Sequence, residues 1–96
     1  MADPVEADPV VADGTGRLAV RYFAGARAAA GTREETVAAD PGAPLAEVLD
    51  RLAATRPALA RVLPACSFLL DGTAARREDQ VGAATGLDVL PPFSGG

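Results

Sequence analysis

The stretch PLAEVLDRLAATRP, residues 44–57, has a helical pattern. Its apolar side chains recur at i, i+3, i+4 and i+7 and so share one helix face; they are Leu45, Val48, Leu49 and Leu52. Pro44 suits the first turn, where a proline costs no hydrogen bond, and Pro57 disfavours helical backbone just before it. Glu47 and Arg51 stand at i and i+4 and are expected to pair. The stretch therefore predicts one amphipathic helix with a buried stripe.

Strand patterns precede this helix. In residues 17–23, Leu18, Val20 and Tyr22 alternate with other side chains and are expected to face the core, which leaves Phe23 on the opposite face. A loop or short helical segment around residues 25–31 leads to a second strand at residues 34–38, and Asp40-Pro41-Gly42 is a turn signal. Both strands are expected to belong to a small sheet that the helix packs across.

Shorter elements follow the helix. Leu59, Val62 and Leu63 predict a helical turn stopped by Pro64. A buried strand is expected at residues 67–70, followed by a tight hairpin turn at Asp71-Gly72. Residues 76–79 are expected to form a solvated loop because their charges cancel, and residues 87–90 to form the last strand. In that last strand Leu87 and Val89 share one face and Leu90 lies on the other.

The order of the elements predicts an α+β domain with one main helix packed across a small mixed β-sheet. Residues 17–90 form this domain, and 96 residues suffice for one modest core without metal or disulfide. Residues 1–16 repeat an acid-and-proline pattern without amphipathic period and are interpreted as a disordered acidic tail. Residues 91–96 form a separate C-terminal tail.

Composition excludes several classes of function. The net charge of −4 argues against nucleic-acid binding and favours a basic protein partner. The chain has no histidine, the commonest acid–base group at neutral pH, so no autonomous catalysis is expected. Cys66 has no second cysteine to pair with, and we interpret it as a core cysteine in a reducing compartment, with a redox or sulfur-relay role as the alternative. Neither a secretory signal nor a membrane span is recognisable, which predicts a cytoplasmic protein.

The sequence ends in PPFSGG, residues 91–96. Two glycines without a Cβ give a thin tip that can enter a narrow slot. The prolines before them hold the backbone extended and carry no N–H to pair with the domain. The ending therefore presents the carboxylate of Gly96 to another protein.

Several motifs together resemble the ubiquitin-like β-grasp sulfur carriers of the MoaD/ThiS family. These are RYFA at residues 21–24, FLLDG at residues 68–72 and LDVLPPFSGG at residues 87–96. The resemblance covers residues 17–96, and its ending is closest to MoaD, the small subunit of molybdopterin synthase. Gly86-Leu87-Asp88 departs from the Gly-Asp-Glu turn common in the family, and the acidic extension before Arg17 is a second departure.

The resemblance implies a chemistry in which the partners carry the catalytic groups. An ubiquitin-activating-type adenylyltransferase would use ATP to adenylate Gly96, and a sulfur donor protein would convert it to a thiocarboxylate, with no cofactor bound to the chain. Gly95 and Gly96 would form the reactive tip. The large subunit of molybdopterin synthase would then receive it, and partner contacts are expected at Phe23, Leu90, Pro91, Pro92, Phe93 and Ser94.

Two alternatives stay open at this stage. The chain could carry sulfur for another pathway, such as thiamine, cysteine or a secondary metabolite. It could also be a ubiquitin-like interaction or conjugation module whose tail docks or joins a lysine of a target.

Overall fold

A computed structural model describes residues 16–92 of the chain. Its elements, in chain order, are β1 (Gly16–Tyr22), α2 (Ala24–Ala30), β2 (Glu34–Ala39), α3 (Leu45–Thr55), α4 (Pro57–Val62), the 3-10 turn η2 (Leu63–Ala65), β3 (Ser67–Leu70), β4 (Thr73–Ala75) and β5 (Gly86–Leu90). Gly16, which the sequence assigned to the acidic tail, is the first residue of β1.

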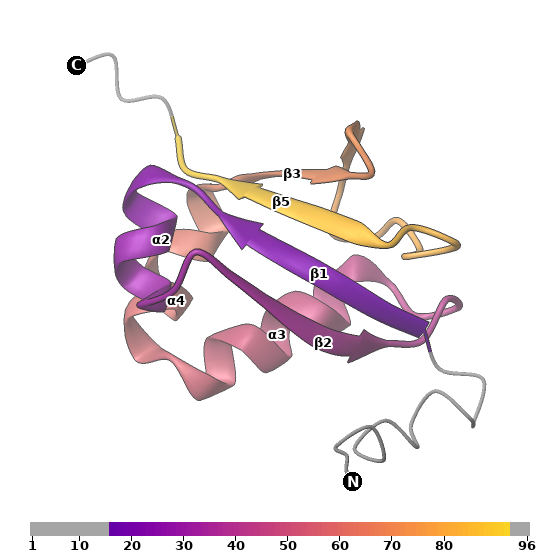
Figure 1. The fold of residues 1–96 in the computed structure, drawn as a ribbon, viewed down its shortest axis with the longest axis horizontal. Coiled ribbons are helices and arrows are strands. Elements are labelled where there is room, and N and C mark those ends of the chain that lie inside the picture. The colour runs from indigo at the N-terminus through magenta and orange to yellow at the C-terminus, as the bar shows by residue number, and fades with distance from the viewer. Residues whose placement is uncertain (1–15, 93–96) are drawn as a thin grey trace, which may run out of the picture.

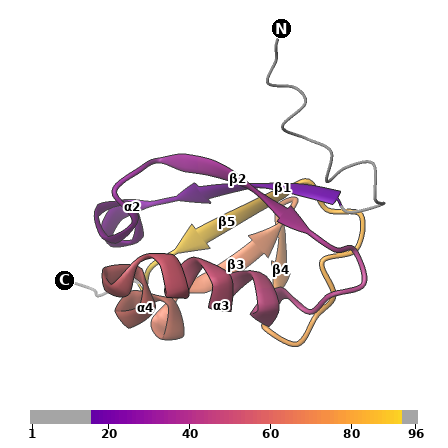
Figure 2. The same cartoon turned by 90° about the horizontal axis from the view of Figure 1, so that it is seen from below.

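The five strands form one mixed sheet in the order β2-β1-β5-β3-β4 (Figure 1). The β1 and β5 strands pair in parallel, and every other neighbouring pair is antiparallel. Helices α3 and α4 lie against one face of the sheet, and α2 lies at the end of β1 (Figure 2). No helix of residues 16–92 covers the other face, which we call the open face. This arrangement is the predicted ubiquitin-like β-grasp fold.

The core forms where the stripe of α3 meets the inward side chains of the sheet. The buried side chains named by the sequence are Leu18, Val20, Tyr22, Leu45, Val48, Leu49, Leu52, Leu87 and Val89, and all belong to one cluster. Among the described residues, no polar or charged residue is buried. Both predicted periods, 3.6 in the helix and 2 in the strands, are thereby confirmed.

Some local predictions were wrong. Arg51 does not pair with Glu47 in the structure; its guanidinium donates to the carbonyl oxygen of Ala38 in β2. Pro44 lies just outside α3, in extended backbone at the N-cap. Pro64 does not stop the helical turn, because the chain continues as a 3-10 turn through Ala65.

The strand β4 was missed by the sequence analysis. It has three residues, Thr73–Ala75, and pairs with β3 across the predicted Asp71-Gly72 turn. Both turn residues adopt left-handed backbone, with φ of 49° at Asp71 and 83° at Gly72, as the tight turns of two-residue hairpins require. Thr-Ala-Ala offers no large side chain whose alternation would reveal a strand.

Candidate functional site

The central strand β5 carries the candidate site. It lies between β1 and β3 and ends at Leu90, at the end of the sheet near α2 (Figure 1). The backbone N–H of Phe23, directly after β1, donates to the carbonyl of Val89 at 3.2 Å. The point where the tail leaves the domain is therefore held from the β1 side. We call Leu90, Pro91 and Pro92 the tail root.

The prolines of the tail root belong to no helix or strand. Pro91 is half-buried and Pro92 is exposed. Neither has an N–H to extend the sheet, so the ladder of β5 ends at Leu90, as expected. The other predicted tail residues, Phe93, Ser94, Gly95 and Gly96, lie outside the described residues.

An apolar patch lies on the open face beside the tail root. Phe23 is 39% exposed and is the one exposed large hydrophobic residue among residues 16–92. The parallel register pairs Tyr22 with Val89, so Phe23 and Leu90 come next and share the open face. Leu90 is half-buried. The structure thus brings together the two side chains that the sequence placed on this face.

Leu69 is a third apolar residue of the open face, and the sequence analysis missed it. It pairs with Asp88 of β5 and is half-buried, whereas its neighbour Phe68 is buried in the core. Alternation along residues 67–70 contains the signal that would have found it. Phe23, Leu69 and Leu90 together form what we call the apolar patch.

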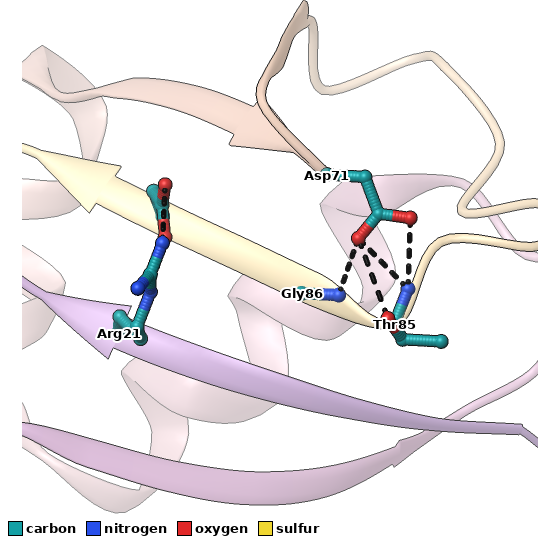
Figure 3. A network of polar contacts seen from close by, with 5 residues as sticks. Arg21, Asp71, Thr85 and Gly86 are labelled. Carbon is teal, nitrogen blue, oxygen red and sulfur yellow. Dashed lines mark hydrogen bonds and ion pairs between the residues drawn. The ribbon is translucent and has the colours of Figure 1, made fainter.

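Arg21 lies beside the ring of Phe23 and is held there by Asp88. Its Nε donates to Asp88 Oδ1 at 2.8 Å and its Nη2 to Asp88 Oδ2 at 3.1 Å, a two-pronged ion pair between β1 and β5 (Figure 3). The hydrogen bond and the charge of Asp88 raise the pKa of Arg21. The guanidinium carbon lies 5.8 Å from the centre of the Phe23 ring, within range of a cation–π contact. The ion pair therefore holds a cation beside the aromatic ring.

Asp71 holds the other end of β5. Its carboxylate accepts the backbone N–H of Thr85 at 3.1 Å and that of Gly86 at 2.9 Å (Figure 3). Its own N–H donates to the carbonyl of Gly86 at 2.9 Å. The β3–β4 turn is thereby tied to the first residue of β5, and the strand that bears the tail is fixed at both ends.

Cys66 packs against the core, as predicted. Its Sγ lies 3.2 Å from the carbonyl oxygen of Val62, to which the thiol donates. Burial raises the pKa of this thiol, so less thiolate is present at neutral pH. Because the thiolate is the nucleophile, these surroundings favour a structural role over a sulfur-relay role.

Residues 16–92 contain no group of three histidine, cysteine, aspartate or glutamate side chains placed to hold a metal ion. No helix in this part of the chain is both long and apolar enough to cross a membrane.

Comparisons with known proteins agree with this geometry. The model of the ThiS family matches residues 20–96. A molybdopterin synthase sulfur carrier subunit from Chlamydomonas reinhardtii is 35% identical over 82 residues, which cover 83% of this chain and 99% of that protein.

Two solved structures also resemble this one. SAMP1 from Haloferax volcanii, a small archaeal modifier protein, superposes with a TM-score of 0.72 at 31% identity over 84% of this chain and 100% of its own. A putative molybdopterin converting factor subunit 1 from Pyrococcus furiosus gives a TM-score of 0.71 at 17% identity, over 81% of this chain and 99% of its own. The latter likeness concerns the fold alone.

Proposed function

Because the chain belongs to the ThiS family and is a ubiquitin-like sulfur carrier of the ThiS/MoaD type, we propose that it is the small subunit of molybdopterin synthase. In this role its C-terminal thiocarboxylate donates sulfur during molybdenum cofactor biosynthesis. The observation that carries the proposal is the similarity to the Chlamydomonas sulfur carrier subunit along nearly that protein's whole length.

The position of the tail root supports this proposal. The ladder of β5 ends at Leu90, and two prolines lead away from the sheet beside an exposed aromatic ring. Partner proteins that bind the apolar patch would therefore meet the tail where it leaves the domain. We propose that Phe23, Leu90 and the residues 91–94 guide the diglycine into the partner's site.

The chemistry begins with the activation of an unreactive carboxylate. A carboxylate oxygen of Gly96 attacks the α-phosphorus of ATP in the activating enzyme, and pyrophosphate leaves. The terminal sulfur of a persulfide on the donor protein then attacks the acyl carbon, and AMP leaves. A second thiol of the partner cleaves the resulting acyl disulfide, which releases the thiocarboxylate and leaves a disulfide on the partner side.

Delivery takes place in the large synthase subunit. The thiocarboxylate sulfur attacks a carbon of the pterin precursor and displaces an oxygen leaving group from it. Water then cleaves the acyl–sulfur bond, which leaves the sulfur on the pterin and returns the carboxylate of Gly96. Each chain delivers one sulfur, so a dithiolene requires two deliveries. The chain supplies the acyl carrier, and the catalytic side chains and ATP belong to its partners. We place this cycle in the cytoplasm, whose reducing conditions suit the unpaired Cys66.

A reconstituted reaction tests the pathway. The chain is incubated with its activating enzyme, ATP, a sulfur donor, the large synthase subunit and the pterin precursor, and the dithiolene product is measured. A parallel reaction offers the thiamine-pathway acceptor instead. We expect sulfur transfer in the reaction that contains the pterin precursor and none in the reaction that contains the thiamine-pathway acceptor. Sulfur transfer only to the thiamine acceptor would contradict the proposed pathway and keep the carrier role.

A conjugation role is the second candidate, and the likeness to SAMP1 favours it, because that relative is called a modifier protein. In that role the activated Gly96 would form an amide with a lysine of a target protein. A pull-down from the host followed by peptide mass spectrometry would then find Gly96 linked to lysines of other proteins.

A further inference from the structure

A depression lies beside the tail root, at the end of β1 and against the α2–β2 connection. We call it the arginine depression; it is lined by Arg21, Tyr22, Phe23, Arg27, Thr32, Arg33 and Glu34. Three of these residues are arginines and one is an acid. The lining is therefore positive, and the exposed ring of Phe23 adds an apolar surface to it.

Two of the three arginines have no partner in the domain. Arg21 is bound by Asp88, as described above. In contrast, the side chains of Arg27 and Arg33 make no ion pair or hydrogen bond with any other part of residues 16–92. Both residues are exposed. Their charges are available to a partner and need not first be released from an internal contact.

The positive depression contrasts with the acidic net charge of the chain. Residues 1–15 contain four acids and no arginine, whereas residues 16–92 contain nine arginines and nine acids. The net charge of −4 thus comes entirely from the segment before β1. It does not describe the surface beside the tail root, and the basic partner expected from composition does not fit this surface.

The position of the depression connects it to the tail. Phe23, part of its lining, donates its N–H to Val89, two residues before Pro91. A protein that takes up the tail must therefore come close to Arg27 and Arg33. Acidic side chains placed there would be attracted by the two free guanidinium groups, which would orient the docking and speed the encounter.

We propose that Arg27 and Arg33 bind an acidic segment of the protein that receives the tail, here the large subunit of molybdopterin synthase. The inference rests on the proposed function for the identity of that protein. Guanidinium groups bind carboxylates in a two-pronged geometry, and the Phe23 ring in the lining of the same depression suits the apolar stems of glutamate side chains. The apolar patch would thus bind apolar groups of the partner and the two arginines its acidic groups, within one interface.

Charge reversal tests the proposal. The variant carrying Arg27→Glu and Arg33→Glu is titrated with the purified large subunit by isothermal calorimetry at low and high salt. We expect the affinity at low salt to fall about tenfold or more, and the difference from the natural chain to shrink at high salt, because salt screens exposed charges. Arg76→Glu with Arg77→Glu is the matched control, since it reverses the same number of charges at two exposed residues on the loop after β4, outside the depression.

The remaining outcomes are also decisive. Circular dichroism checks that the reversed variant folds. If it does not fold, the variant with Arg27→Gln and Arg33→Gln takes its place, and its expected loss of affinity is smaller. Equal affinity of the natural chain and the variant reversed at Arg27 and Arg33 would overturn the proposal, as would an equal loss in the control reversed at Arg76 and Arg77. If the natural chain itself does not bind the large subunit, the proposed function fails and this proposal fails with it. Restoration of affinity by a lysine in place of an acid on the partner would identify the segment.

Discussion

Removal of Gly95 and Gly96 is expected to abolish sulfur transfer and to leave the stability of the domain unchanged. Transfer requires a carboxylate at the end of a thin tip, and residues 91–94 without the glycines end in a serine whose side chain is too wide and whose carboxylate is two residues too short. Stability is expected to stay the same because, among residues 16–92, every residue of the buried core lies between Leu18 and Val89. The reconstituted reaction measures transfer, and urea unfolding measures stability.

A second variant controls for the composition of the tip. Adding one alanine after Gly96 keeps both glycines and moves the carboxylate by one residue, and the same loss of transfer is expected. Transfer that survives the deletion would contradict the role of Gly96. Loss of folding in the deletion variant would show that the tail is structural.

Leu87→Ala is expected to have the opposite effect, with a large loss of stability and retained carrier chemistry. Leu87 is 0% exposed and lies on β5 in the centre of the sheet. Replacing a buried leucine by alanine costs about 2–5 kcal/mol, a large part of the roughly 5–15 kcal/mol that stabilises a small domain. The midpoint of urea unfolding should therefore fall steeply.

Leu69→Ala is the matched control for Leu87→Ala. It removes the same atoms from a half-buried leucine of the open face, in the neighbouring strand β3. The expected loss of stability is smaller, because less apolar surface leaves the interior. The folded fraction of the Leu87→Ala variant should still accept sulfur. If the two variants lose the same free energy of unfolding, Leu69 must be as deeply buried as Leu87, which would contradict the structure.

Periodicity predicted the parts of the fold that depend on local spacing. The stripe from Leu45 to Leu52 and the alternation of Leu18, Val20 and Tyr22 identify the buried faces, because each pattern repeats within a few residues. The strand β4 has too few and too small side chains for such a pattern. The Arg51 contact with Ala38 was also missed, since the partner is a backbone carbonyl that any residue could supply.

The site was predictable only in part, because local spacing in the sequence does not specify contacts between distant residues. The exposed Phe23 and the face of Leu90 follow from alternation along single strands. The ion pair of Arg21 with Asp88 joins residues 67 positions apart, and it requires the parallel pairing of β1 with β5, which local spacing does not specify. The positive depression was missed because net charge sums over the whole chain, including the acidic residues 1–15.

The central claim is that Gly96 becomes a thiocarboxylate, and intact-protein mass spectrometry tests it most directly. The chain is incubated with its activating enzyme, ATP and a sulfur donor, and its mass is compared with that of a sample without ATP. The account predicts a gain equal to the exchange of one oxygen for sulfur, located in the C-terminal peptide and lost in the variant without Gly95 and Gly96. An unchanged mass, with an activating enzyme that loads another carrier under the same conditions, would contradict it.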